Sequence, residues 1–495
     1  MRTGVSNRGR KKLVIVGGGT AGRLAAAALA NQLTPDRYEI TVIESAHVGS
    51  ISVGESLVPH VVRFIRDLGV SEQDFVASTQ ANYKLGIQFD DWLEKGSSFF
   101  QPFGRLGKNY NGYGFFQCWL KARSEGDRSA LTDYSPAAAL ARHQKFVHPD
   151  TITPGSPLDG TDYAFQLDAK NIQHYLREYA EQRNVRHIQA HVVSVNLGES
   201  GDIQSVELNN RQTVPGDLFI DCSGTRGMLI DEALHSPFTS WQELLPCDRA
   251  VAMQSENYGS TRLNSTFTAG KHGWVWGIPL KERTSNGLVF CSGQCSDNEA
   301  IEVLESVVDS GQTTDPLLIP LRQGARKYQW IKNCIAIGQS GGLLEPLESS
   351  SIYLITRGVQ LMLELFPDLW AEELSWPSLA TQFNTRMSIE YESIRDFIIL
   401  HYVTSQRSDT DFWRSCRSLE IPESIVSRLE LFKERGELGV FEHGLFTDAN
   451  WQVLLTGMKI IPRSYHPFLD LSDFRGIQRV MKRDRDQIEA AAEAL

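Results

Sequence analysis

Two glutamates near residue 350 have the residue types and the spacing of a reactive acidic site. Glu345 and Glu348 flank Pro346, which restricts the residue before it and has no backbone N–H to donate. Three serines follow, and serine is a favoured residue at the start of a helix. Apolar residues then recur at helical spacing, at Ile352, Ile355, Val359, Met362, Leu363 and Phe366. The pattern predicts a loop that delivers two carboxylates to the start of a buried helix.

The start of a helix presents free backbone amides, which attract an anion, so a carboxylate beside them is an unusual combination. A purely structural interpretation is also available, namely a capped helix with acidic residues in its first turn. This stretch alone leaves both interpretations open.

A lysine occurs within a strictly alternating segment, residues 83–90. The alternation predicts a strand with one apolar face, formed by Tyr83, Leu85, Ile87 and Phe89. Lys84 falls on the other face with Gly86, Gln88 and Asp90, so the local pattern favours solvent exposure of its side chain.

A glycine turn near the N-terminus has the order strand, turn, helix and acid-ended strand that is typical of dinucleotide binding. Gly17 allows a tight turn, Gly19 lets a pyrophosphate approach the backbone, and Gly22 permits close packing of the helix. Glu44 can accept hydrogen bonds from a ribose. The flanking patterns cover residues 13–16, 24–33 and 38–44. A glycine-rich surface turn is the alternative.

Further strand-then-glycine patterns end near Gly224 and Gly338, which predicts one nucleotide-binding fold with insertions rather than a string of separate domains. Residues 99–165 are rich in glycine, proline and aromatics, and we expect an irregular insertion there that walls a pocket or simply packs aromatic side chains. Trp274 and Trp276 fall on one face of a predicted strand. Beyond residue 370 the pattern is mainly helical.

Composition narrows the class of protein. The 495 residues are 41% hydrophobic and 22% charged, which favours a globular chain of two or three structural units. A formal net charge of -11 argues against nucleic acid or an anionic membrane as the main partner. Seven scattered cysteines without zinc spacing predict no metal site and reduced thiols in a cytoplasmic protein.

Together, these motifs resemble the flavin-dependent halogenases of the tryptophan-halogenase family, in the order in which that family carries them. The resemblance rests on the glycine turn with Glu44, Val-Gly-Glu-Ser at 53–56, Tyr-Lys-Leu-Gly-Ile at 83–87, Asp-Cys-Ser-Gly at 221–224, Trp-x-Trp-x-Ile-Pro at 274–279 and Glu-Pro-Leu-Glu-Ser at 345–349. It covers nearly the whole chain, and its lysine and tryptophan segments are more specific than its glycines.

The resemblance implies an α/β fold with a Rossmann-like, three-layer FAD-binding core of the glutathione-reductase type. An inserted and a C-terminal, mainly helical module would complete it on the substrate side. The implied division is 1–95 and 166–368 for the core, 96–165 for the insertion and 369–495 for the helical module.

The resemblance also implies a mechanism. A separate flavin reductase supplies FAD as FADH2, and O2 and a halide ion, chloride or bromide, then give hypohalous acid beside the flavin. The acid travels through a tunnel to Lys84, which hydrogen-bonds it or carries the halogen as a haloamine, and Glu348 assists and stabilises the cationic ring intermediate. A neutral amine needs a lowered pKa, which burial could supply. Trp274 and Trp276 keep organic substrate away from the flavin.

The implied sites cover three further groups of residues. The cofactor would contact Gly17, Gly19, Thr20, Ala21, Gly22, Glu44, Gly54, Glu55, Ser56 and Gly338. The halide would bind the amides of Ser350 and Ser351, where the family commonly has Thr-Gly, so halide preference could differ. The substrate pocket would include Gln101, in place of a common histidine, with Phe103, Trp274, Trp276 and Phe446. No role follows for Glu345.

Substrate identity is where the chain departs from the family pattern. Enzymes of this family that act on free tryptophan carry a Tyr-Tyr pair and a downstream glutamate, but here Glu434, Arg435 and Phe441 occupy those positions. We therefore expect a small aromatic substrate such as indole rather than free tryptophan. A flavin monooxygenase that hydroxylates an aromatic and a non-catalytic flavin-binding protein are the alternatives.

Overall fold

A six-stranded sheet with five parallel strands forms the centre of the nucleotide-binding part, in the order β20-β21-β12-β1-β2-β8. The computed structural model describes residues 9–45, 53–256, 262–308, 311–371, 375–439 and 444–495. The strands are β1 (Lys11–Val16), β2 (Tyr38–Glu44), β8 (Arg186–Gln189), β12 (Leu218–Asp221), β20 (Trp330–Ile331) and β21 (Cys334–Ala336). Both faces of this sheet are covered, which explains the apolar runs in its central strands, residues 13–16 of β1 and 218–220 of β12.

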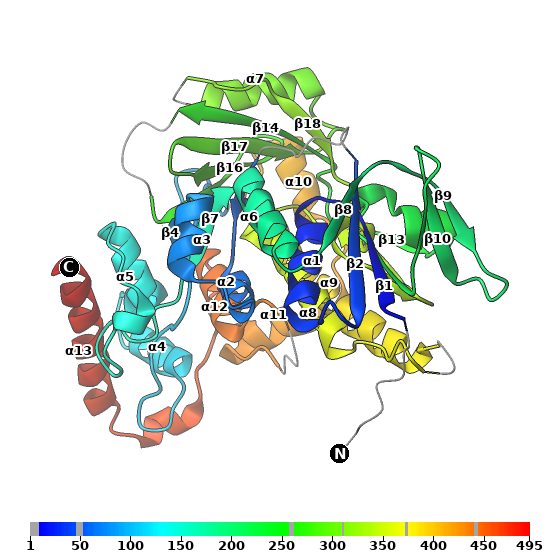
Figure 1. The fold of residues 1–495 in the computed structure, drawn as a ribbon. Helices are drawn as coiled ribbons and strands as arrows, with labels where there is room; N and C mark the ends of the chain where they lie inside the picture. The colour runs from blue at the N-terminus through cyan, green and yellow to red at the C-terminus, as the bar shows by residue number, and fades with distance from the viewer. Residues whose placement is uncertain (1–8, 46–52, 257–261, 309–310, 372–374, 440–443) are drawn as a thin grey trace, which may run out of the picture.

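Two different layers cover those faces. Helices α1 (Thr20–Gln32), α6 (Ala169–Glu181) and α8 (Ser350–Glu364) lie on one side, where Leu13 and Ile15 join the main core. On the other side lies an antiparallel sheet of β9 (Val192–Leu197), β10 (Ile203–Leu208) and β11 (Thr213–Pro215), which packs against Val14 and Val16. Alternate residues of β1 therefore serve opposite layers, and the expected three-layer Rossmann-like core is confirmed (Figure 1).

A seven-stranded sheet forms the second large unit, in the order β18-β14-β17-β16-β15-β5-β6. Its strands are β5 (Gly86–Asp90), β6 (Ser98–Pro102), β14 (Arg249–Glu256), β15 (Asn264–Ala269), β16 (Gly273–Pro279), β17 (Arg283–Phe290) and β18 (Leu317–Pro320). Helix α7 (Asp297–Val307) covers one face at β14 and β17 (Figure 1). On β16, Trp274 and Trp276 are both buried, as the alternation predicts.

Two small sheets connect these units. One has the order β3-β7-β4, with β3 (Gly54–Ser56), β4 (Asn82–Lys84) and β7 (Ala164–Asp168). The other contains β13 (Phe238–Ser240), β19 (Gly324–Arg326) and β22 (Gly342–Leu343). The segment predicted as one strand over residues 83–90 is thus two strands, because the chain passes from one sheet to another at Leu85.

Short helices make up more of the insertion than its composition suggests. Residues 96–165 contain α4 (Phe115–Ser124) and α5 (Pro136–Arg142) as well as β6, so the expectation of an irregular segment is wrong there. A proline at the first position and Ser135 as the N-cap explain α5. The remaining helices are α2 (Pro59–Asp67), α3 (Glu72–Thr79), α9 (Pro377–Val403), α10 (Asp411–Arg417), α11 (Glu423–Arg435), α12 (Asp448–Gly457) and α13 (Phe474–Glu493).

The mainly helical pattern beyond residue 370 is confirmed by α9 to α13. Helix α13 returns to the insertion and packs on α4 and α5, so the C-terminal end of the chain lies beside residues 115–142 (Figure 1). Across the described ranges, no helix combines the length and the apolarity that crossing a membrane requires.

Candidate active site

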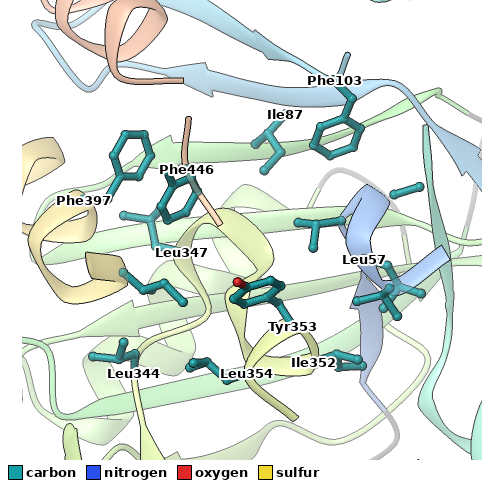
Figure 2. Packing of buried hydrophobic residues seen from close by; sticks show 14 of the residues in the cluster. Leu57, Ile87, Phe103, Leu344, Leu347, Ile352, Tyr353, Leu354, Phe397 and Phe446 are labelled. Atoms are coloured by element: carbon teal, nitrogen blue, oxygen red, sulfur yellow. The ribbon is translucent and has the colours of Figure 1, made fainter. Parts of the chain in front are cut away.

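A left-handed corner positions Glu348. Glu348 and Ser349 have φ values of 64° and 60°, a conformation that is uncommon for residues with a side chain. The corner is held by Leu347, which is fully buried in the apolar cluster beside Tyr353 and Leu354 (Figure 2). Helix α8 then begins at Ser350, and the side chain of its N-cap residue, Ser349, makes no capping hydrogen bond. The serines at this helix start are therefore available for other contacts.

Lys84 is fully buried, so the solvent exposure predicted from its strand pattern is wrong. The break at Leu85 is the reason, because Lys84 belongs to β4 and points into the space between β3 and the corner. Its Nζ donates to the carbonyl oxygen of Leu57 at 3.0 Å and to Oγ of Ser349 at 3.2 Å. The Phe103 ring centroid lies 5.0 Å from Nζ. Desolvation lowers the pKa of Lys84 to about 7, although Glu348 acts in the opposite direction.

His401 is the partner of Glu348. Its Nε2 lies 3.1 Å from Oε1 of Glu348, and its Nδ1 lies 3.0 Å from the carbonyl oxygen of Phe397. A carbonyl oxygen only accepts, so Nδ1 must donate, and neutral His401 then has no proton on Nε2. Both side chains are almost fully buried, so the contact between Nε2 of His401 and Oε1 of Glu348 is shielded from water.

Sequence reasoning missed His401. Its partner lies 53 residues away in the chain, and its own helix, α9, presents an ordinary run of buried residues. A histidine at helical spacing from buried apolar residues is the only signal, and such a histidine is more often a core residue. His401 becomes part of the site because α9 packs against α8 in the folded protein.

Glu345 occupies a separate buried environment. Its Oε1 accepts from the Tyr402 hydroxyl at 2.7 Å, and its backbone N–H donates to Oε1 of Gln323 at 3.0 Å. Burial raises the pKa of this carboxyl to about 7. Because Tyr402 follows His401 directly, two neighbouring residues of α9 hold the two glutamates of the loop apart.

Ser350 and Ser351 are the first residues of α8, whose N–H groups have no acceptor within the helix. Ser350 is fully buried, and its hydroxyl has no hydrogen-bond partner among the described residues. Ser350 has a φ of -81° and Ser351 lies within the helix, outside the positive-φ residues. The backbone therefore does not require the glycine that the family commonly has at position 351. Ser350 joins a positive helix end with an unpaired donor, which suits an anion.

The glycine turn has the shape of a nucleotide site. Gly17 has a φ of 117°, and a Cβ there would lie 2.1 Å from the carbonyl oxygen of Cys222. A Cβ on Gly22 would lie 1.8 Å from the carbonyl oxygen of Gly17. At Gly19, the N-cap of α1, a Cβ would meet no described atom within 4 Å. Gly17 and Gly22 are thus needed by the fold itself, while Gly19 leaves the backbone accessible at the N-terminus of α1, where amides favour an anion.

The other predicted cofactor residues surround this turn. Glu44 ends β2, and its two carboxylate oxygens accept from Arg23 at 2.8 Å and from Arg177 at 2.9 Å. Thr20 Oγ1 accepts from the side-chain amide of α6 residue Gln173 at 3.0 Å. Gly338 has a φ of 79° and lies against Ala21.

β3 contributes Gly54, Glu55 and Ser56. The N–H of Gly54 donates to Oγ of Ser285 at 2.9 Å. Glu55 keeps some exposure but is enclosed on most sides, and this desolvation raises the pKa of its carboxyl to about 7. Oγ of Ser56 accepts from the Ser349 hydroxyl, with 3.0 Å between the two oxygens.

Aromatic residues dominate the predicted pocket. The Phe446 ring stacks on Phe397 at 3.9 Å between centroids, and both rings belong to the same cluster of buried side chains as Phe103 and Leu347 (Figure 2). Gln101 is buried, and its Nε2 donates to the carbonyl oxygen of Asn450 at 3.3 Å. Its Oε1 has no partner among the described residues. Of the three clamp positions, Glu434 and Arg435 lie in α11, and Phe441 lies outside the described residues.

Trp274 and Trp276 lie on β16, with 6.2 Å between their ring centroids. The part of the chain that the structure describes contains no group of three histidine, cysteine or acidic side chains that could hold a metal ion. All seven cysteines are free.

Comparison with known proteins identifies the family. The family model described as tryptophan halogenase matches residues 12–473. The chain is 41% identical to BrvH, a flavin-dependent halogenase from Brevundimonas sp. BAL3, with a TM-score of 0.92 over 98% of this chain and 97% of that one. It is 36% identical to Xcc4156, a flavin-dependent halogenase from Xanthomonas campestris, with a TM-score of 0.93 over 99% and 97% of the two chains.

A curated relative agrees with these structures. The 7-chloro-L-tryptophan 6-halogenase KtzR from Kutzneria sp. (strain 744) is 32% identical over 501 residues, which cover 96% of each chain. The glycine turn, the buried lysine and the acidic corner occur in one chain that matches these proteins along nearly its whole length. The chain belongs to the tryptophan halogenase family and is a flavin-dependent halogenase.

Proposed function

We propose that this enzyme uses FADH2, O2 and chloride or bromide to transfer an electrophilic halogen to a small electron-rich aromatic such as indole. The observation that carries the proposal is the buried cluster at the corner before α8. There Lys84 donates to Ser349, and Oε1 of Glu348 lies 3.1 Å from Nε2 of His401. An ammonium or amine and a carboxylate, both shielded from water, match the charges that a halogen transfer develops.

The residues of the glycine turn fit FAD, because Gly19 leaves its backbone accessible and α1 presents its N-terminus. When bound as FADH2, delivered by a separate flavin reductase, the cofactor supplies the electrons that turn O2 and halide into hypohalous acid. Halide is held by the amides of Ser350 and Ser351 and by the Ser350 hydroxyl. Trp274 and Trp276 separate the flavin from the aromatic substrate.

Lys84 receives the oxidant at the substrate end. In its protonated form it donates to the oxygen of hypohalous acid and polarises the oxygen–halogen bond. In its neutral form it takes up the halogen as a haloamine, and hydroxide leaves as water with a proton from the amine. Glu348 stabilises the positive charge of the ring and accepts its proton, and His401 keeps the carboxyl positioned. A pKa near 7 makes both forms of Lys84 accessible.

Gln101 supports a substrate that carries an N–H or O–H group. Its Oε1 is a buried acceptor without a described partner, and such a group costs roughly 1–3 kcal/mol when it stays unpaired. The indole N–H would satisfy it. Wild-type enzyme should therefore prefer indole to N-methylindole by roughly tenfold in kcat/KM, and Gln101→Met should largely remove that preference. An unchanged preference in the variant would assign no such role to Gln101.

A substrate panel with bromide and with chloride tests the function, with products measured by mass spectrometry after incubation with a flavin reductase and oxygen. The expected result is monohalogenated indole, formed faster than halogenated free tryptophan. A higher rate with tryptophan would contradict the substrate class. Hydroxylated product without halide would favour the monooxygenase alternative. Binding of reduced FAD without oxidation of any aromatic would favour the non-catalytic one.

A further inference from the structure

A chain of buried hydrogen bonds extends from Lys84 away from the reacting side. Nζ of Lys84 donates to Ser349 at 3.2 Å, and the Ser349 hydroxyl lies 3.0 Å from that of Ser56. Oγ of Ser56 lies 2.7 Å from Oγ of Ser265, which lies 2.8 Å from Oε1 of Gln166. All five side chains are at least nine-tenths buried. They come from the corner and from four strands, namely β3, β4, β7 and β15.

Gln166, at the far end of this hydrogen-bond chain, fixes the direction in which each hydroxyl of the chain donates. Nε2 of Gln166 donates to the carbonyl oxygen of Arg262 at 3.1 Å, so the amide nitrogen must face that carbonyl. Oε1 then faces Ser265 and only accepts, so Ser265 must donate to it. Each hydroxyl has one proton, and therefore Ser56 donates to Ser265 and Ser349 donates to Ser56. Ser349 has only lone pairs left for Lys84.

We infer that Gln166, Ser265 and Ser56 are positioning residues that force Ser349 to accept a hydrogen bond from Lys84 and so aim the reactive direction of its nitrogen. This inference rests on the proposed role of Lys84. Leu57 and Ser349 are the two hydrogen-bond acceptors of Nζ among the described residues. Two of the three free tetrahedral positions of the Lys84 nitrogen are N–H groups that donate to these two acceptors. The third position therefore has one fixed direction. It holds the third N–H of the ammonium or the lone pair of the neutral amine.

Breaking this hydrogen-bond chain should change the pKa of Lys84. In Ser265→Ala, Ser56 no longer has to donate outwards, so Ser56 and Ser349 can both turn and the Ser349 hydroxyl can donate to the Lys84 lone pair. That arrangement favours the neutral amine. The apparent pKa of Lys84 should therefore fall by about one unit, the effect of one ordinary hydrogen bond. Gln166→Met should act in the same way, because it removes the acceptor that fixes the direction.

Two readouts on the full-length holoenzyme test this inference. The first is the pH dependence of kcat/KM for indole bromination. The second needs no activity: the urea midpoint of each protein is compared across pH with that of the same protein carrying Lys84→Met, and the inflection of the difference gives the pKa of Lys84. Ser265→Thr retains a hydroxyl. Ser255→Ala removes a different buried hydroxyl of the same sheet, one that takes no part in this hydrogen-bond chain.

The expected result is an inflection about one pH unit lower in Ser265→Ala and Gln166→Met than in wild type, in Ser265→Thr and in Ser255→Ala. Inflections that coincide in all five proteins would overturn the inference, as would an equal shift in Ser255→Ala. If none of the proteins brominates indole, the proposed function fails, while the stability readout still decides whether the chain acts on Lys84.

Discussion

Burial of Lys84 opposes the charged form of its side chain, and this makes its ionisation visible in the folding equilibrium. Among the described residues its Nζ has two hydrogen-bond acceptors, and the Phe103 ring lies beside it. Folding lowers its pKa from 10.5 to about 7. Below pH 7 both states carry the proton and the folded state bears the full desolvation cost. Between pH 7 and 10 the folded state has lost a proton that the unfolded state keeps.

Lys84→Met should therefore be more stable than wild type at pH 6, by an amount that shrinks as the pH rises. Stability increases with pH wherever the unfolded state binds more protons. Between pH 7 and 10, the free energy of unfolding of the wild type should therefore rise by about 1.4 kcal/mol per pH unit relative to that of the variant. Urea unfolding at several pH values measures the difference. A difference that does not change with pH would mean that Lys84 keeps an ordinary pKa in the folded enzyme.

The Ser350 hydroxyl makes a second residue-scale prediction. Chloride is smaller than bromide and forms the stronger hydrogen bond, so loss of one donor should weaken chloride use more than bromide use. Ser350→Ala should raise KM for chloride roughly three- to tenfold and change KM for bromide less, the effect of one hydrogen bond. Ser350→Thr, which retains the hydroxyl, is the control. Equal changes in KM for the two halides would show that the Ser350 hydroxyl does not bind the halide.

Among the elements, two breaks in regular structure place the chemistry. The change of sheet at Leu85 buries Lys84, and the left-handed corner before α8 turns Glu348 towards His401. Period-two alternation across residues 83–90 could not reveal the first break, because it continues through Leu85 into another sheet. The glycine turn behaves differently, since strand, turn and helix lie next to each other in sequence. Its strand over residues 38–44 therefore appears with the expected bounds.

Two glycines of that turn should respond differently to the same substitution. Gly22→Ala places a Cβ 1.8 Å from a carbonyl oxygen and should destabilise the fold, with a lower thermal midpoint even without flavin. Gly19→Ala meets no described atom within 4 Å, so the apoprotein should keep its thermal midpoint and lose affinity for FAD. Thermal unfolding and flavin titration of both variants measure this. Normal FAD affinity in Gly19→Ala would place the pyrophosphate elsewhere.

At the scale of the whole molecule, contacts between residues far apart in the sequence explain which features could not be predicted from the sequence. Residue types and family order predict the three-layer core, Lys84 and Glu348. They do not predict His401 or the Lys84–Gln166 chain, whose members are up to 293 residues apart and meet only in the folded protein. The insertion also depends on distant residues, because α13, from the other end of the chain, packs against its α4 and α5.

Removal of residues 474–495 tests that dependence. It uncovers the apolar face against which Ile477, Met481 and Ile488 pack, and it breaks the contacts of Glu489 with Arg142 and His143. Because α5 in turn supports β6, which carries Gln101, the truncated enzyme should show a lower thermal midpoint and a higher KM for indole. Its affinity for FAD should stay close to wild type. A loss of FAD affinity as large as the loss for indole would contradict this separation.

The most direct measurement of the central claim compares wild type with Lys84→Met in the presence of reductase, oxygen, bromide, indole and excess free methionine. Methionine consumes hypobromous acid that escapes into solution. Wild type should form bromoindole despite the scavenger, while Lys84→Met should consume as much oxygen but yield methionine sulfoxide and no scavenger-resistant bromoindole. Scavenger-resistant bromoindole from Lys84→Met at the wild-type rate would contradict the claim that Lys84 delivers the halogen.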